Sequence, residues 1–123
     1  MQLLRRGVIY QEALRLEDEQ PIGIFQVSDA DFRHGHANLN LLVDPVHSDA
    51  LDAPLECFVE RAFRDFSLRK LCIAVVAEDL VLPRPLESRV RNVGILREHR
   101  RRSADLFVDV HLYELWADVW SIR

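Results

Sequence analysis

The chain of 123 residues is long enough to bury one hydrophobic core without disulfides or metals, and it is expected to form a single domain. Apolar residues make up 49% and charged residues 29% of the sequence, which is the balance of an ordinary globular domain. The formal net charge of −4 at pH 7 disfavours nucleic acid as a partner, because proteins that bind nucleic acid are commonly basic.

The sequence carries no sign of export or membrane insertion. Residues 1–6 are not followed by the apolar segment and small residues of a signal peptide. No apolar run approaches the roughly 20 residues that span a bilayer. Cys57 and Cys72 lack CxxC spacing and are interpreted as buried small hydrophobic residues in a reducing compartment. A cytoplasmic protein without membrane contact is expected.

The first third of the chain predicts three strands. Residues 8–16 and 22–27 form the expected first hairpin, with a turn in the acidic segment 17–21. Residues 37–43 alternate apolar and polar side chains and predict a third strand. Asp44-Pro45 ends it, because proline cannot donate a hydrogen bond to a strand ladder.

The clearest helix signal is an apolar stripe with helical spacing, formed by Leu55, Phe58, Val59, Ala62, Phe63 and Phe66. Asp52 is the expected N-cap, and Pro54 is tolerated in a first turn. The continuous apolar run 71–77 then predicts a strand buried on both faces.

The last third predicts a broken helix followed by a hairpin. Pro83 and Pro85 interrupt any helix across residues 80–86, which leaves residues 86–93 for a short one. Residues 94–102 and 106–115 predict a C-terminal β-hairpin. The predicted fold is therefore α/β (α+β), a mixed, mostly antiparallel twisted sheet with one long helix.

The predicted hairpin resembles the closing strands of the GCN5-related N-acetyltransferases (GNATs), in particular the branch that acetylates ribosomal proteins and polyamines. That branch typically ends on G-x-L-R-E followed by D-V-x-x-Y-x-L, and this chain has Gly94-Ile-Leu-Arg-Glu98 and Asp109-Val-His-Leu-Tyr-Glu-Leu115. Asp44-Pro45 also matches the end of the family's central strand. The resemblance implies a single GNAT-like domain over residues 1–123 that lacks the family's first strand and first two helices.

The resemblance also implies a cofactor loop, which the family builds as R/Q-x-x-G-x-G/A to hold the pyrophosphate of acetyl-CoA on backbone N–H groups. Its counterpart here is the segment Ser48, Asp49, Ala50, Leu51, Asp52 and Ala53. At an effective dielectric constant of about 20, a carboxylate about 4 Å from a phosphate charge would be unfavourable by roughly 4 kcal/mol. A degenerate loop with no cofactor is therefore expected, or acetyl-CoA if the family activity is retained.

The family's asparagine after the buried strand and its general-acid tyrosine are replaced by Glu78-Asp79 and by residues near Glu87. The main hypothesis is thus a pseudoenzyme that serves as a small-molecule-binding or assembly module. The alternative is an active or repurposed acyltransferase that acts on a small amine in the cleft between the central strands. His47, Glu78 or Asp79 would then be the acid or base. A purely structural subunit is the third hypothesis.

Three other groups of residues each have a functional and a structural interpretation. His34 and His36, near Asp29 and Asp31, are either ligands of a zinc ion or polar residues of a loop exposed to solvent. Asp109, His111 and Tyr113, with His99 across the hairpin, are acid–base groups or one polar strand face. No metal site is expected.

Seven arginines gather between Arg84 and Arg102. They indicate a solvated edge, an anion site, or a contact with acidic residues of a second subunit such as Asp44, Asp49 and Asp52. A homodimer, or a partner chain that covers the open sheet, is expected.

Overall fold

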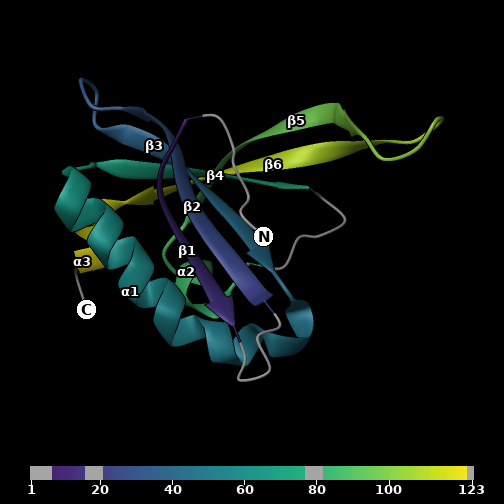
Figure 1. Ribbon diagram of the computed structural model, residues 1–123. Coiled ribbons are helices and arrows are strands. Elements are labelled where there is room, and N and C mark those ends of the chain that lie inside the picture. Colours follow the sequence, from purple (N-terminus) through teal and green to yellow (C-terminus); the bar gives the residue numbers. More distant parts are fainter. Residues whose placement is uncertain (1–6, 16–20, 77–81, 122–123) are drawn as a thin grey trace.

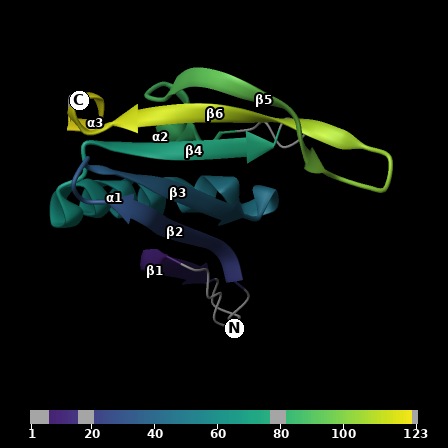
Figure 2. The ribbon, with the colours of Figure 1, turned by 90° about the horizontal axis from the view of Figure 1, so that it is seen from above.

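The computed structural model describes residues 7–15, 21–76 and 82–121, and the predicted turn at 17–21 lies largely outside them. These residues form a six-stranded sheet in the order β1-β2-β3-β4-β6-β5. The long helix α1 packs along this sheet (Figures 1 and 2). The elements are β1 (Val8–Arg15), β2 (Pro21–Asp31), β3 (His36–Val43), the 3₁₀ turn η1 (Pro45–His47), α1 (Ser48–Phe66), β4 (Lys70–Val76), α2 (Arg84–Glu87), β5 (Arg91–Arg101), β6 (Phe107–Trp116) and α3 (Ala117–Ser121).

Neighbouring strands of the described sheet are antiparallel except for β3 and β4, which run parallel. The predicted fold class, with one long helix and a C-terminal β5–β6 hairpin, is therefore confirmed. No helix in the described part of the chain has the length and apolar character needed to cross a membrane.

The predicted apolar stripe of α1 forms the centre of the core. Phe58 is fully buried, its ring centroid lies 5.5 Å from that of Phe25 on β2, and it stacks on Tyr10 of β1 at 4.6 Å. Full burial of a side chain of this size contributes about 1.5–3 kcal/mol. Leu71 on β4 and Leu115 on β6 are fully buried and continue the core, whereas Cys57 on α1 is exposed, so the prediction that it is buried was wrong. The helix ends at Phe66, and its C-cap residue Ser67 adopts the left-handed conformation with φ 52°.

The start of α1 differs from the prediction. The helix begins at Ser48 with His47 as N-cap, so the assignment of Asp52 as N-cap was wrong. The reason is η1, which is capped by the Asp44 carboxylate accepting from the Val46 N–H at 3.0 Å and which leads directly into the helix. Pro54 consequently lies inside α1 and not in its first turn.

The expected short helix over residues 86–93 was also wrong. Helix α2 spans Arg84–Glu87, with Pro85 in its first turn, where the missing N–H has no intrahelical role. Strand β5 already begins at Arg91. Leu86 of α2 is fully buried and packs in the hydrophobic core, which holds α2 in position.

The β5–β6 hairpin extends beyond the rest of the sheet as an arm (Figures 1 and 2). Glu98 interrupts the strand register with φ 47°. Asp109 on β6 accepts the Glu98 N–H at 2.8 Å and an Arg97 guanidinium hydrogen bond at 3.0 Å. These bonds, the Glu98 N–H first, lower the pKa of Asp109. The carboxylate thus stabilises a β-bulge, which supports the structural interpretation of this strand face.

Candidate ligand-binding cleft

The parallel strands β3 and β4 stay paired over a short distance only. Their register joins His36–Asn38 to Lys70–Cys72, and no ladder pair joins the later described residues of the two strands. Both strands run in the same direction, so their carboxyl ends separate at the same edge of the sheet. In open sheets with parallel strands, a crevice of this kind is a common place for a ligand.

A cleft of about 830 Å³ occupies the space between the separated strands. Its volume falls within the roughly 300–1,000 Å³ typical of small-molecule sites. The walls are mainly apolar and come from the two strands and from α1. They include Leu39, Leu41, Val43, Leu51, Leu55, Ile73, Val75 and Val76.

The edges of β3 and β4 that face the cleft carry backbone N–H and C=O groups that can form hydrogen bonds with a ligand. β3 pairs with β2 on its outer side, and β4 pairs with β6. Beyond Asn38 and Cys72, the N–H and C=O groups of the inner edges have no ladder partner across the gap among the described strand residues. Backbone polar groups require hydrogen bonds, so these edges suit an extended ligand that contains amides.

Charged residues reach the cleft from three elements. Asp49 and Asp52 come from the first turns of α1, Arg84 and Glu87 from α2, and Arg100 from β5. Arg84 Nη2 lies 3.8 Å from Asp49 Oδ1, and the two side chains are 79% and 91% exposed. Such an exposed pair contributes little to stability. It shows, however, that one of the expected arginine–aspartate contacts lies within the chain.

The predicted site residues fall into three groups. The residues of the degenerate loop that line the cleft are Ser48, Asp49, Leu51 and Asp52. Ala50 and Ala53 are exposed on α1, and neither they nor His47 belong to the described lining of the cleft. Glu78 and Asp79 lie outside the described residues, so their roles stay predictions.

The sequence pointed to residues near Glu87 through the position of the family's tyrosine, but it did not place Arg84 and Arg100 at this cleft. The arginine-rich segment was visible, but Arg100 is far along the chain from β3 and β4 and reaches the cleft only through the order of strands in the sheet. No local motif marks such a residue.

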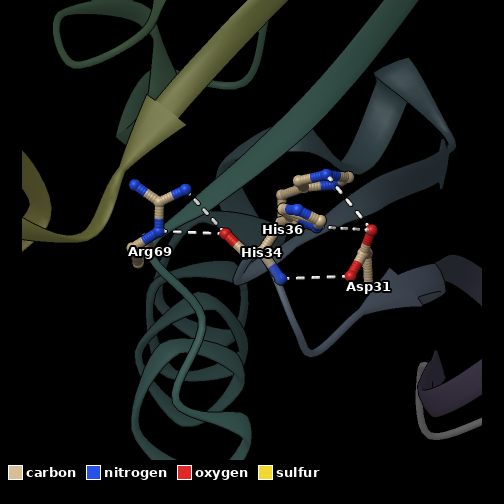
Figure 3. A network of polar contacts seen from close by, with 4 residues as sticks. All are labelled: Asp31, His34, His36 and Arg69. Carbon is tan, nitrogen blue, oxygen red and sulfur yellow. Dashed lines mark hydrogen bonds and ion pairs between the residues drawn. The ribbon is translucent and has the colours of Figure 1, made fainter.

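The histidines of the β2–β3 turn have a structural role (Figure 3). Asp31 accepts the His34 N–H at 3.1 Å, and its Oδ2 lies 3.2 Å from His34 Nδ1 and 3.9 Å from His36 Nε2. Arg69 donates two hydrogen bonds to the His34 carbonyl, at 3.0 and 2.6 Å. In the described part of the chain, no three metal-ligand side chains are grouped so that they could hold a metal ion. These contacts fix the turn instead.

The comparisons with known proteins identify the fold. Neither a protein-family model nor a curated protein sequence matches the chain. A mutant of the spermidine N-acetyltransferase SpeG from Vibrio cholerae matches at 16% identity and a TM-score of 0.73, over 92% of this chain and 68% of the other. The Vibrio cholerae spermidine N-acetyltransferase in complex with CoA and spermine matches at 16% identity and a TM-score of 0.72, over 89% and 66%.

These similarities show that the chain has the fold of the GNAT superfamily, as the resemblance of its C-terminal hairpin predicted. The structures that it resembles are those of enzymes named for the acetylation of spermidine. Because the identities are low, the likeness concerns the fold.

Proposed function

We propose that this chain is a GNAT-type N-acyltransferase that binds an acyl-CoA between β3 and β4 and transfers the acyl group to a small amine. The observation that carries the proposal is the separation of the two strands after Asn38 and Cys72, which opens the cleft. A solved structure of the same fold is described as a complex with CoA and spermine, which supports both ligand classes.

The shape of the cleft suits the flexible arm of an acyl-CoA. This pantetheine arm is long, narrow and contains two amide groups. It can therefore lie between the strands and form hydrogen bonds with the inner edges of β3 and β4, as an added strand would. The apolar walls, with Leu41 and Ile73 among them, accommodate its methylene groups.

The charges at the cleft oppose the phosphates less than the sequence suggested. The Asp49 side chain is 91% exposed, so the dielectric constant around it approaches that of water. Repulsion between unit charges 4 Å apart then falls to about 1 kcal/mol. Arg84 and Arg100 also line the cleft and provide guanidinium groups that bind phosphate. The carboxylate of Asp49 therefore weakens phosphate binding without preventing it, whereas Asp52 is only partly exposed and opposes the phosphates more strongly.

The reaction requires the amine nitrogen to attack the thioester carbonyl. A C–N bond forms, the C–S bond breaks, and coenzyme A leaves as the thiolate. The amine loses one proton and the thiolate takes up one. Among the described lining residues, Glu87 is a carboxylate outside the α1 turn, and we assign it the role of accepting the amine proton. His47, Glu78 and Asp79 stay alternative acid–base candidates.

A second function, ligand binding without transfer, is favoured by one observation. The described lining of the cleft contains no tyrosine, histidine, cysteine or lysine, so those common proton donors to a leaving thiolate are missing from it. In this alternative the cleft binds a small molecule, and the chain acts as a binding or assembly module.

A thiol-release assay distinguishes the two functions. The purified chain is incubated with acetyl-CoA and a panel of small amines including spermidine, and both free thiol and acetylated amine are measured. The enzyme proposal predicts turnover that is lost in Glu87→Gln and retained in Glu60→Gln. Glu60 is the control because it is an exposed carboxylate outside the described lining of the cleft, and its substitution changes the net charge by the same amount. Saturable binding without turnover supports the module, whereas neither binding nor turnover contradicts both proposals.

A further inference from the structure

Exposed apolar side chains are concentrated on the arm. Of the ten large apolar residues that are exposed in the described part of the chain, five lie on the β5–β6 hairpin or its turn, namely Val93, Ile95, Leu96, Leu106 and Phe107. Single exposed apolar residues are ordinary, but neighbouring ones mark an interaction surface, and Leu106 and Phe107 are adjacent near the turn of the hairpin. An isolated two-stranded ribbon is also only marginally stable in water, so contact with another surface would stabilise it.

The arm is basic in an otherwise acidic molecule. The hairpin, residues 91–116, contains five arginines and four carboxylates, a net charge of +1, so the remainder of a chain with net charge −4 carries −5. The partner that this charge favours is acidic. The chain itself provides such a surface, so a second copy meets the requirement.

A surface at the end of β3 has the complementary character. Leu42 and Val46 are 53% and 83% exposed. Asp44 precedes η1 and Asp49 lies in the first turn of α1, so both flank Val46 in the sequence. We call these four residues the β3-end surface. It joins exposed apolar groups to carboxylates, whereas the tip of the arm joins Leu106 and Phe107 to arginines.

Pairing of two β5 edges is a poorer arrangement. Antiparallel pairing of β5 with a second β5 would place the arginines near one end, Arg91, opposite those near the other, Arg100 and Arg101. Like charges directly opposite one another destabilise a sheet, and charged edge strands are a known protection against such pairing. The arm therefore fits the acidic β3-end surface better than a second arm.

We propose that two copies of this chain form a two-fold dimer in which the arm tip of each copy (Arg101, Leu106 and Phe107) packs on the β3-end surface of the other. The same two surfaces are used in both copies, so the assembly closes at the dimer. Within one copy the Arg101 guanidinium lies 4.7 Å from the Phe107 ring centroid. This arrangement presents an aromatic ring and a positive charge together, a combination common at interfaces.

The apolar part of the interface is tested with Leu106→Ser, measured by sedimentation velocity over a range of concentrations. Val119→Ser is the matched control, because Val119 on α3 is 43% exposed and Leu106 is 46% exposed. The proposal predicts a wild-type dimer, at least tenfold weaker association in Leu106→Ser and unchanged association in Val119→Ser. Loss of an interface anchor commonly has an effect of this size. A monomeric wild type at high concentration, or equal association of all three proteins, overturns the proposal.

The charged part is tested by exchanging charges between the two surfaces. Arg101→Glu and Asp49→Arg should each weaken the dimer, because each creates two like-charge contacts in its own homodimer. Mixed together, they should form a heterodimer, since one contact keeps the native pair and the other has the reversed pair. Arg33→Glu, a charge reversal in the exposed β2–β3 turn, should change nothing. Failure of the mixture to restore association overturns the assignment of these surfaces.

Discussion

The guanidinium of Arg89 lies over the ring of Trp120, 4.2 Å from the ring centroid, and its Nη2 lies 3.0 Å from Glu56 Oε1. This contact joins the segment after α2 to α3 and to α1. Trp120 is only 4% exposed, and the Arg89 and Glu56 side chains are 20% and 30% exposed. The position of α2, and with it one wall of the cleft, therefore depends on a partly buried cation.

Replacement of this cation should destabilise the fold. Arg89→Ala removes a charge-assisted hydrogen bond and a cation–π contact, and we expect a loss of about 1–3 kcal/mol in the free energy of unfolding. Urea denaturation measures it. Arg64→Ala is the control, because Arg64 and Asp65 form an exposed pair, 65% and 54% accessible, that should contribute less than about 0.5 kcal/mol. Equal effects of the two substitutions would contradict the role given to Arg89.

Two glycines offer a matched test of the packing beneath the cleft. A Cβ at Gly23 would lie 3.1 and 3.2 Å from the two methyl carbons of Leu51, whereas one at Gly94 would meet no atom within 4 Å. Gly23→Ala should therefore displace Leu51, a cleft residue, and destabilise the protein by about 1–3 kcal/mol. Gly94→Ala should leave stability unchanged or raise it slightly. Thermal unfolding of both variants measures the difference, and a tolerated Gly23→Ala would show that α1 shifts freely.

The sequence predicted most of the fold because its periodic signals reflect burial. The stripe at Phe58 and its neighbours lies in the core, and the apolar run of β4 is observed within one residue of its expected limits at either end. The errors occurred where local rules compete. Asp52 and Pro54 resemble a helix start, but the turn at η1 begins the helix earlier. The Asp44 side chain caps η1 by accepting a hydrogen bond from the N–H of Val46, two residues further along. Such a short contact leaves no periodic signal in the sequence.

The site was less predictable than the fold. The segment 48–53 was located through its position after β3, and four of its six residues line the cleft. Arg84 and Arg100 could not be assigned, and Arg100 reaches the cleft only through the order in which β4, β6 and β5 join the sheet. The exposure of Asp49, which decides how strongly its charge acts on a phosphate, is a property of the folded chain and leaves no signal in the sequence.

Asp109 should make part of the stability depend on pH. The Glu98 N–H, and with it Arg97, lowers the pKa of this carboxyl in the folded state. The stabilisation is therefore complete above the unfolded pKa of about 3.9 and is lost as the pH falls through the lower folded value. Urea unfolding of the wild type and Asp109→Ala from pH 6 to pH 3 measures this. The difference between them should shrink on acidification, and a difference independent of pH would contradict the assigned contact.

The cleft itself can be closed by a single substitution. Ala74 on β4 lines the cleft and is exposed, so Ala74→Trp adds a large side chain there without displacing the core. Ala53→Trp is the control, because Ala53 is exposed on α1 outside the described lining of the cleft. Both variants should remain folded, as judged by circular dichroism. Only Ala74→Trp should lose the ligand, because the added indole occupies the space between the strands.

Isothermal titration of acetyl-CoA into the wild type, Ala74→Trp and Ala53→Trp tests the central claim, that the space between β3 and β4 holds an acyl-CoA. We predict saturable binding of one acetyl-CoA per chain to the wild type and to Ala53→Trp, and none to Ala74→Trp. Absence of binding to the wild type at millimolar ligand, or equal binding to all three proteins, would contradict it.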